Sequence, residues 1–341
     1  MICTTQKSTS NLRAISGDSV KAGKLPTLTA VICTCNRPQS LSVCVQSVVR
    51  QSVPPMELIV VDDGRLNDQE LESMTQSCRS AGISFEYLRK DKPGLPKSRN
   101  LAVRRAHGDI IQFLDDDVVL DPQFCREILQ LYADDTAGAI VGTEGSLSKS
   151  QSPTLSTRII DYVYRIAGWW ALKPRTCSPA PIPESLHDRN RTMPTWKIAG
   201  ATMAFRRSAL LENAFDEALS GYALGEDRDM AYRMSARGWI VRSCKAKAVH
   251  YVDPSSRPPS YLFGQMIVRH YVRIMTRNGF VRIGDRLVIG YSLTVIALSL
   301  LGFSLVNPKR FFPQFLGMIS AAVTLFVDVL LNRIESADCV E

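Results

Sequence analysis

The chain has 341 residues, of which 45% are hydrophobic and 22% charged, so its composition is that of a globular rather than a disordered protein. The net charge of +8 and the pI near 9.1 fit an anionic ligand, a nucleic acid or an anionic membrane surface. No zinc ribbon, basic-aromatic repeat or Lys/Arg-rich block occurs, and we therefore expect no nucleic-acid partner.

The nine cysteines are scattered and form no disulfide framework. Cys33 and Cys35 are too close together for the usual zinc pair, and no second pair completes the set. We therefore expect reduced thiols and a cytosolic setting for the folded part. Residues 1–25 are rich in Ser, Thr and Lys and carry no apolar signal segment, which predicts a flexible tail.

Strands and helices alternate over the first 120 residues. The pattern predicts strands at 28–33, 56–61, 83–88 and 110–118, and helices at 41–51, 68–81 and 97–107. Residues 58–61 are continuously apolar, which is typical of a parallel strand covered on both faces. The alternation therefore predicts a doubly wound, mainly parallel, Rossmann-like α/β sheet with right-handed crossovers.

Polar residues follow three of these strands, at 34–37, 62–63 and 115–117. Ligands bind beyond the carboxyl ends of the strands in such sheets. The acids Asp115, Asp116 and Asp117 are either a divalent-cation site or a solvated loop of turn and cap residues. In an extended chain, Asp115 and Asp117 would share one side. The recurrence at three strand ends favours a site, and no Gly-rich dinucleotide or P-loop motif competes with it.

Four segments, residues 31–38, 57–64, 94–102 and 108–117, resemble the family 2 glycosyltransferases, which are inverting enzymes of the GT-A fold. The resemblance implies that Asp63 and the Thr34 region hold the nucleotide, and that Asp115 and Asp117 frame an acidic motif for Mg2+ or Mn2+. Arg99 lies in the segment that usually faces the nucleotide; the alternative is a solvated helix charge. The expected nucleotide-sugar-binding residues are Thr34, Asn36, Arg37, Asp63, Arg99, Asp115, Asp116 and Gly200.

Residues 146–195 give the weakest sequence signal in the chain, and the one element predicted there is an aromatic helix at 159–172. Trp169 and Trp170 could stack on a sugar or lie at a membrane interface, but we interpret them as core residues. His187 is predicted to lie in a loop. The small residues from Gly200 onward permit close backbone approach to a ligand, and the resemblance puts this segment beside the donor sugar and the acceptor.

The pattern Gly225-Glu226-Asp227-x-Asp229, followed by Arg233, resembles the family's catalytic-base motif. The match implies that Asp227 is the base and that Glu226 contacts the acceptor or lies just behind it. An acid at a helix start is also an ordinary N-terminal residue, which is the alternative. His250 follows the last predicted strand, 239–249. A lone histidine is usually structural or solvent-facing, but the resemblance implies that one at this position reaches the metal or the diphosphate. We expect His250 to join the metal site, where imidazole suits Mn2+ better than Mg2+.

Residues 287–306 are uncharged and long enough to cross a bilayer, and a second uncharged run follows at 311–327. We predict a transmembrane or deeply inserted hairpin. Several arginines precede the hairpin, and positive charge collects on the cytoplasmic side of membranes, so we expect the catalytic domain on the cytoplasmic side of the inner or plasma membrane. These arginines are Arg269, Arg273, Arg277, Arg282 and Arg286. Lys309 and Arg310, in the loop of the hairpin, are positive charges that do not fit this orientation.

The predicted organisation is a GT-A domain at 26–255, with nucleotide-binding (26–120) and acceptor (121–255) halves. A basic amphipathic helical linker at 256–286, the hairpin at 287–331 and a tail at 332–341 complete it. The family's processive Gln-x-x-Arg-Trp motif is missing, which favours transfer of one sugar. We expect a nucleotide-sugar donor, a glycan or lipid-linked acceptor of the cell envelope, and membrane lipids as partners.

The sequence leaves two alternative functions open. A sugar nucleotidyltransferase would need a Gly-rich turn after the first strand, which residues 34–38 lack. A catalytically silent membrane scaffold or glycan-binding protein is the other.

Overall fold

The computed structural model describes residues 25–135, 137–150, 155–168, 172–173, 192–251 and 258–330. The predicted tails, at 1–25 and 332–341, lie outside the described residues except for Leu25, as do Trp169, Trp170 and His187.

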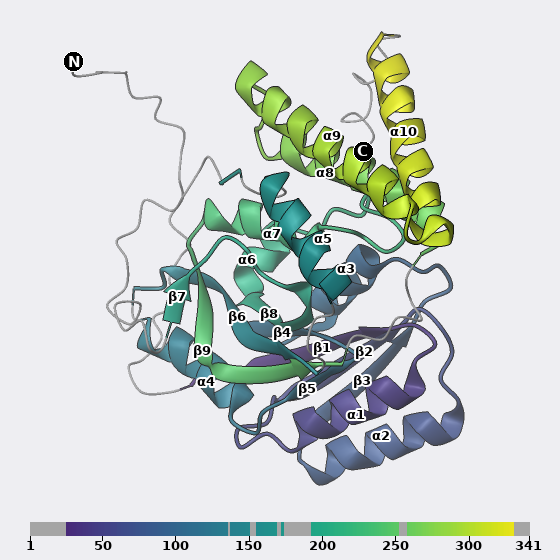
Figure 1. Ribbon diagram of the computed structural model, residues 1–341. Helices are drawn as coiled ribbons and strands as arrows, with labels where there is room; N and C mark the ends of the chain where they lie inside the picture. Colours follow the sequence, from purple (N-terminus) through teal and green to yellow (C-terminus); the bar gives the residue numbers. More distant parts are fainter. Residues whose placement is uncertain are drawn as a thin grey trace, which may run out of the picture.

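A single mixed sheet, with strands in the order β3-β2-β1-β4-β8-β6-β9-β5, forms the centre of the molecule (Figure 1). Its first four strands are parallel, as predicted: β1 (Leu28–Thr34), β2 (Glu57–Asp62), β3 (Ser84–Arg89) and β4 (Ile110–Asp115). The other half is β5 (Val118–Leu120), β6 (Ile140–Lys149), β7 (Thr192–Pro194), β8 (Met203–Arg206) and β9 (Trp239–His250). Strand β8 is antiparallel to both β4 and β6, whereas β6 and β9 are parallel.

Helices cover both faces of the sheet because alternate strand residues point to opposite sides. Ile32 and Val60 share one buried cluster with residues of α1 (Pro38–Val49), α2 (Asp68–Ser80) and α4 (Phe124–Asp134). Val31 and Ile59 share another with residues of α3 (Leu95–Arg105), α6 (Arg207–Glu212) and α7 (Glu226–Ser235). Burial on both faces is the reason that strand β2 reads as a continuous apolar run.

Two boundaries differ from the prediction for local reasons. Helices α1 and α3 begin two or three residues earlier than predicted, because Pro38 and Pro96 lie in their first turns, where proline costs no hydrogen bond. The predicted strand 110–118 breaks at a turn over Asp116 and Asp117. After the turn, β5 pairs antiparallel with β9.

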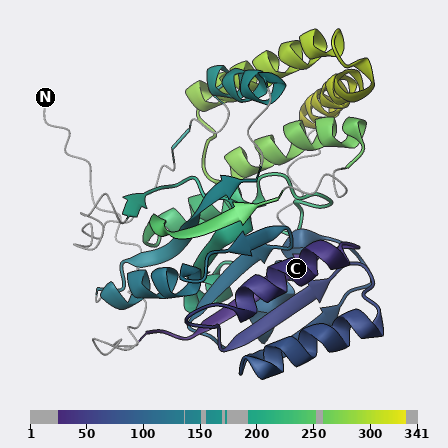
Figure 2. The same ribbon diagram turned by 60° about the horizontal axis from the view of Figure 1, so that its bottom comes forward.

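A separate group of helices lies on the far side of α7 from the sheet (Figure 2). It contains α5 (Leu155–Ile166), α8 (Ser260–Arg277), α9 (Ile283–Ser304) and α10 (Pro308–Leu330). Residues of α8, α9 and α10 share a buried cluster with Ala167, just beyond the end of α5. The predicted aromatic helix at 159–172 therefore starts earlier and ends earlier, as α5.

Helices α8 and α10 cross with their backbones in close contact. A Cβ on Gly264 would overlap the Gln314 carbonyl oxygen, and one on Gly317 would overlap the carbonyl oxygen of Tyr261. Small residues at a helix crossing permit this approach.

Replacing Gly264 with alanine is therefore expected to push α8 away from α10 and to destabilise the protein by about 1–3 kcal/mol, the usual cost of overpacking. Gly290→Ala on α9 is the matched control, since no atom lies within 4 Å of the added Cβ. Unfolding midpoints in mild detergent measure both. Equal midpoints for the two variants would contradict the close crossing.

Candidate functional site

Three strand ends meet at one edge of the sheet. The register pairs Cys33 of β1 with Asp115 of β4, and Thr34 with Asp62 of β2. The strand order reverses between β1 and β4, which is where ligands bind in doubly wound sheets. The pairing of Val118 with His250 brings the end of β9 to the same place.

Asp116 is the structural member of the acidic triplet. Its side chain is fully buried, accepts a hydrogen bond of 2.6 Å from the Thr34 hydroxyl and pairs with the Arg37 guanidinium at 2.6 Å. Burial raises the pKa of Asp116 to about 6, and the Thr34 and Arg37 contacts oppose the rise. Thr34, Arg37 and Asp116, all expected to bind the nucleotide sugar, therefore contact one another.

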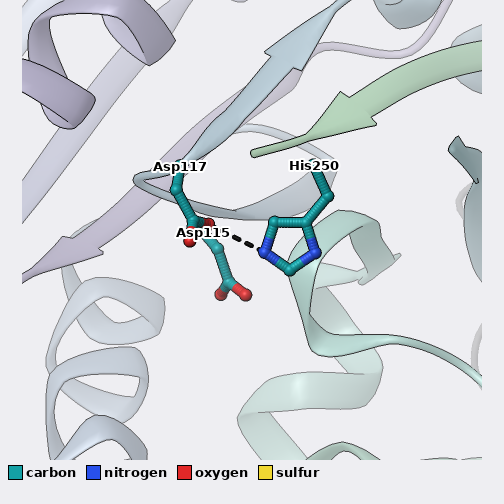
Figure 3. Close-up of side chains that lie close together, drawn as sticks. All are labelled: Asp115, Asp117 and His250. Carbon is teal, nitrogen blue, oxygen red and sulfur yellow. Dashed lines mark ion pairs between the residues drawn. The ribbon is translucent and has the colours of Figure 1, made fainter. Parts of the chain in front are cut away.

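Asp115, Asp117 and His250 form the cluster with the character of a metal site. One ligand atom from each lies within 4.8 Å of the others, and Figure 3 shows the two carboxylates beside the imidazole. His250 Nε2 lies 2.9 Å from Asp117 Oδ1, and this hydrogen bond raises the pKa of His250. Asp115 and Asp117 do lie close together, as expected, but the chain between them is not extended: a turn over Asp116 and Asp117 brings the two carboxylates together.

Asp63 organises the loop between β3 and α3. Its carboxylate accepts hydrogen bonds from the Gly94 amide (2.7 Å) and the Ser98 hydroxyl (2.8 Å), and Lys90 Nζ pairs with it at 2.8 Å. Asn36 has a left-handed backbone (φ 55°) and packs directly against Gly64. Both residues therefore lie at the strand-end edge predicted for the nucleotide.

Arg99 is buried, with 2% of its side chain exposed, so the alternative of a solvated helix charge is wrong. Its guanidinium lies 5.6 Å and 5.5 Å from the ring centroids of Phe113 and Phe215. It pairs with Glu226 and approaches Asp115 at 3.6 Å. Arg99 thus links the acidic cluster to the start of α7.

Glu226 and Asp227 begin α7 after Gly225, whose φ of 86° belongs to the left-handed region. Glu226 is buried against Arg99, and burial raises its pKa to about 7. Asp227 is partly exposed and accepts a 3.1 Å hydrogen bond from the Gly200 amide. Two adjacent acids therefore occupy different environments, one inside the protein and one at the site.

The space over Gly200 is occupied by protein side chains. A Cβ there would lie 3.0 Å from Glu226 Oε1 and 3.2 Å from Arg99 Nη2. The sequence predicted that a ligand would approach the backbone at Gly200. In this structure the side chains of Arg99 and Glu226 approach it instead.

Glu144 and Arg242 support this loop and were missed by the sequence reasoning. Glu144 on β6 is buried and lies 3.3 Å from Arg242 on β9. Burial raises the pKa of Glu144 to about 7, and Arg242 opposes the rise. Arg242 also donates to the Lys197 carbonyl at 3.2 Å, just before Gly200. Isolated acids and bases on strands carry no spacing signal that would have found them.

Helix α8 holds the segment before α7 and is not simply a membrane-facing basic helix. Arg273 and Arg277 both pair with Asp216, at 2.7 and 2.9 Å. Asn278 donates to Asp229 of α7 at 2.9 Å. Two of the five arginines whose positive charge was used to assign the cytoplasmic side are therefore paired with Asp216.

Helices α9 and α10 are long and apolar enough to cross a membrane, with mean hydropathies of 2.0 and 1.5 in their most apolar windows. Only 22% of each window is buried, unlike the core helix of a soluble protein.

A family model described as glycosyl transferase family 2 matches residues 29–213, more than half of the chain. An N-acetylglucosaminyltransferase of Mesorhizobium japonicum is 26% identical over 264 residues, covering 75% of this chain and 58% of that protein. A GalNAc(5)-diNAcBac-PP-undecaprenol beta-1,3-glucosyltransferase of Campylobacter jejuni is 28% identical over 134 residues, 38% of this chain and 43% of that one. The chain thus spans 58% of the length of the first relative and 43% of the length of the second.

Two solved structures share the fold. The mannosyltransferase PcManGT of Pyrobaculum calidifontis, in complex with GDP-Man and Mn2+, has a TM-score of 0.53 at 16% identity, with 90% of this chain and 89% of that chain covered. GalNAc-T7 with UDP, GalNAc and Mn2+ has a TM-score of 0.54 at 16% identity, covering 74% and 48%. These likenesses confirm the predicted GT-A type of α/β sheet.

Proposed function

Because this chain belongs to glycosyl transferase family 2, we propose that it is a metal-dependent, inverting glycosyltransferase. It moves one sugar from a nucleotide-sugar donor to a glycan or lipid-linked acceptor of the cell envelope, at the cytoplasmic face of a membrane. One observation carries the proposal: the cluster of Asp115, Asp117 and His250 lies at the switch point of the sheet, and Arg99 connects it to the acids that begin α7.

The residues of the cluster fit a divalent cation. Two carboxylates and one imidazole are suitable ligands for Mn2+, and less so for Mg2+, which prefers oxygen. Asp116 is fully buried and held by Thr34 and Arg37, whereas Asp115, Asp117 and His250 offer ligand atoms close together, although Asp117 also pairs with Arg37 at 3.5 Å. When bound, the cation supplies positive charge that neutralises the departing diphosphate.

The chain's own residues divide the remaining work. Asp63, Thr34, Asn36 and the loop around them bind the nucleotide beyond the ends of β1 and β2. Asp227, positioned by the Gly200 amide, accepts the proton of the acceptor hydroxyl. As that oxygen forms its bond to the anomeric carbon, the bond to the diphosphate breaks and its electron pair leaves with the diphosphate. A single displacement inverts the anomeric configuration.

Glu226 has a supporting role in this scheme. Its buried carboxylate pairs with Arg99, which also contacts the Gly200 carbonyl at 3.4 Å. Glu226 therefore holds Arg99 and the Gly200 segment in place while the neighbouring Asp227 faces the acceptor.

The test is nucleotide release. The purified full chain is incubated with UDP-GlcNAc, UDP-glucose or GDP-mannose, with and without Mn2+, and with membrane lipid extract as the acceptor. We expect one donor to release its nucleotide diphosphate only when Mn2+ and acceptor are both present. Neither binding nor release with any donor would contradict the proposal and favour a silent scaffold.

Replacing His250 with glutamine is expected to weaken Mn2+ binding by at least the roughly 10–100-fold that changes around a metal ligand cost. The reason is the loss of the only imidazole in the cluster. Titration calorimetry with MnCl2 in the presence of nucleoside diphosphate measures it. His107→Gln, at an exposed histidine that pairs with Glu57, is the control and should leave the affinity unchanged. Unaltered affinity in His250→Gln would remove His250 from the site.

A further inference from the structure

Helix α9 has two distinct faces. Exposed apolar side chains recur every three, four or seven residues along one of them: Ile283, Leu287, Tyr291, Leu298, Leu301 and Leu305, each at least 42% exposed. The opposite face buries Ile289, Ser292, Ile296 and Leu300. This periodicity is that of a helix with one side against protein and one apolar side uncovered.

Helix α10 repeats the pattern. Its exposed apolar residues are Phe312, Leu316, Ile319, Val323 and Phe326, each at least 43% exposed. Its other side, with Met318 and Ala321, is buried against the neighbouring helices. Such a large uncovered apolar area marks a membrane or protein contact.

The first half and the middle of α9 are held against α7 and the end of α5. Ser292 Oγ donates a 2.6 Å hydrogen bond to the Ala167 carbonyl at the end of α5, and both residues are fully buried. Tyr291 donates to the Ile166 carbonyl at 3.2 Å. Ile289 shares a buried cluster with Tyr232 of α7. Figure 2 shows α5, in teal, beside α9, in yellow-green.

This attachment conflicts with a helix that crosses the bilayer. A spanning α9 of 22 residues would have its midpoint at the centre of the hydrocarbon. The end of α5 and part of α7 would have to follow it there. Helix α8, whose Ile267 and Val268 share a buried cluster with Ile296 and Leu300 of α9, would bring the exposed Arg269 with it, although charged groups are costly at that depth.

The charges at the two ends of α9 point the same way. Arg282 and Arg286 lie at its beginning, Lys309 and Arg310 lie just after its end, and all four are exposed. A spanning helix would put the two pairs on opposite sides of the membrane, against the bias that keeps cations on one side. In a helix lying in the membrane surface, both pairs meet anionic headgroups.

We propose that α9, α10 and α5 form a monotopic surface that enters one leaflet of an anionic bilayer, instead of two transmembrane spans. Helix α5 contributes its exposed Ile159, Tyr162 and Ile166, which lie on one side at helical spacing. The inference rests on the membrane attachment in the proposed function and is independent of its chemistry. It puts the turn between α9 and α10 on the same side of the membrane as the active site.

Topology is tested with a protease site inserted after Asn307, in the turn, in the full chain. Membrane vesicles are prepared with the catalytic domain facing outward. A second variant, with the protease site before Leu25, verifies this orientation because its site is then open to cleavage. A one-leaflet surface gives cleavage at both sites to the same extent without detergent. Protection of the turn site until detergent is added would overturn the proposal and establish a spanning hairpin.

Attachment is tested by flotation with vesicles of phosphatidylglycerol and phosphatidylethanolamine. The double variant Leu287→Glu/Leu298→Glu should bind roughly a hundredfold more weakly, because each buried leucine contributes about tenfold. Val43→Glu/Leu211→Glu changes equally exposed residues of the catalytic domain and should bind as the parent does. Equal binding of the two double variants would overturn the proposed surface. Nucleotide release reports on the chemistry separately.

Discussion

Asp227→Asn is expected to lower kcat by about 100- to 10,000-fold, the usual contribution of a general base, while leaving nucleotide affinity close to that of the parent. Asparagine keeps the shape of the side chain, and its one oxygen can accept the hydrogen bond from either the Gly200 amide or the Arg228 amide, which the two carboxylate oxygens of Asp227 accept at 3.1 and 2.7 Å. It cannot take a proton from the acceptor hydroxyl. Nucleotide release under saturating donor measures kcat, and titration calorimetry measures the affinity for the nucleoside diphosphate.

The matched control is Asp109→Asn. Asp109 precedes β4 at the opposite end from the site, where it accepts hydrogen bonds from the Thr27 amide (2.8 Å) and hydroxyl (2.7 Å). Its replacement should leave kcat unchanged. Full activity in Asp227→Asn would assign the base to another residue. A loss of nucleotide affinity that matched the loss of kcat would instead make Asp227 a donor-binding residue.

Arg99→Met is expected to destabilise the protein by about 3–5 kcal/mol, because it leaves the buried Glu226 carboxylate without its partner. Methionine fills part of the space between Phe113 and Phe215, so the effect reports mainly the lost charge. The double variant Arg99→Met/Glu226→Gln removes both charges and should recover most of the stability. Urea unfolding of the single and double variants measures the coupling energy between the two residues.

The pH dependence of Arg99→Met gives an independent check. Burial already raises the pKa of Glu226 to about 7, and Arg99 is the main group that lowers it. Without Arg99 this pKa rises further. A carboxyl whose folded pKa is raised adds stability when protonated, and that stability is lost as pH rises through the folded pKa.

The deficit of Arg99→Met should therefore be largest above the folded pKa of the unpaired Glu226, shrink as the pH falls towards about 7, and level off below that pH. Above about pH 7 the parent's Glu226 is ionised and paired, so the double variant, which lacks this carboxyl, should differ from the parent by a constant amount. A deficit that is constant across this pH range would mean that lost packing, not the unpaired carboxylate, causes the destabilisation.

The predictable part of the site is the part that local patterns encode. Continuous apolar runs identified β1, β2 and β4, and parallel pairing brings their carboxyl ends to one edge. Thr34, Asp63 and Asp115 could therefore be placed near one another from the sequence. The motif around Asp227 likewise identified the start of α7, because its spacing lies within ten residues.

The contacts that sequence reasoning could not reveal join distant segments of the chain. Arg99 shares its helix with Lys97, Arg104 and Arg105, so its neighbours suggest a solvated charge. Its burial follows from Phe113 on one strand and Phe215 over 100 residues away. Glu144 and Arg242 likewise meet only because β6 and β9 pair.

The sequence by itself determined the order of strands and helices, the strand-end positions of the acids and the length of the two C-terminal apolar helices. These features depend on residue type and short-range periodicity, which the chain displays directly. The tertiary structure alone decided that Asp116 is held by Arg37 while Asp115 and Asp117 face His250. It also decided what covers α9, because the length of an apolar run sets how far a helix can reach, whereas the buried contact between Ser292 and Ala167 sets where it lies.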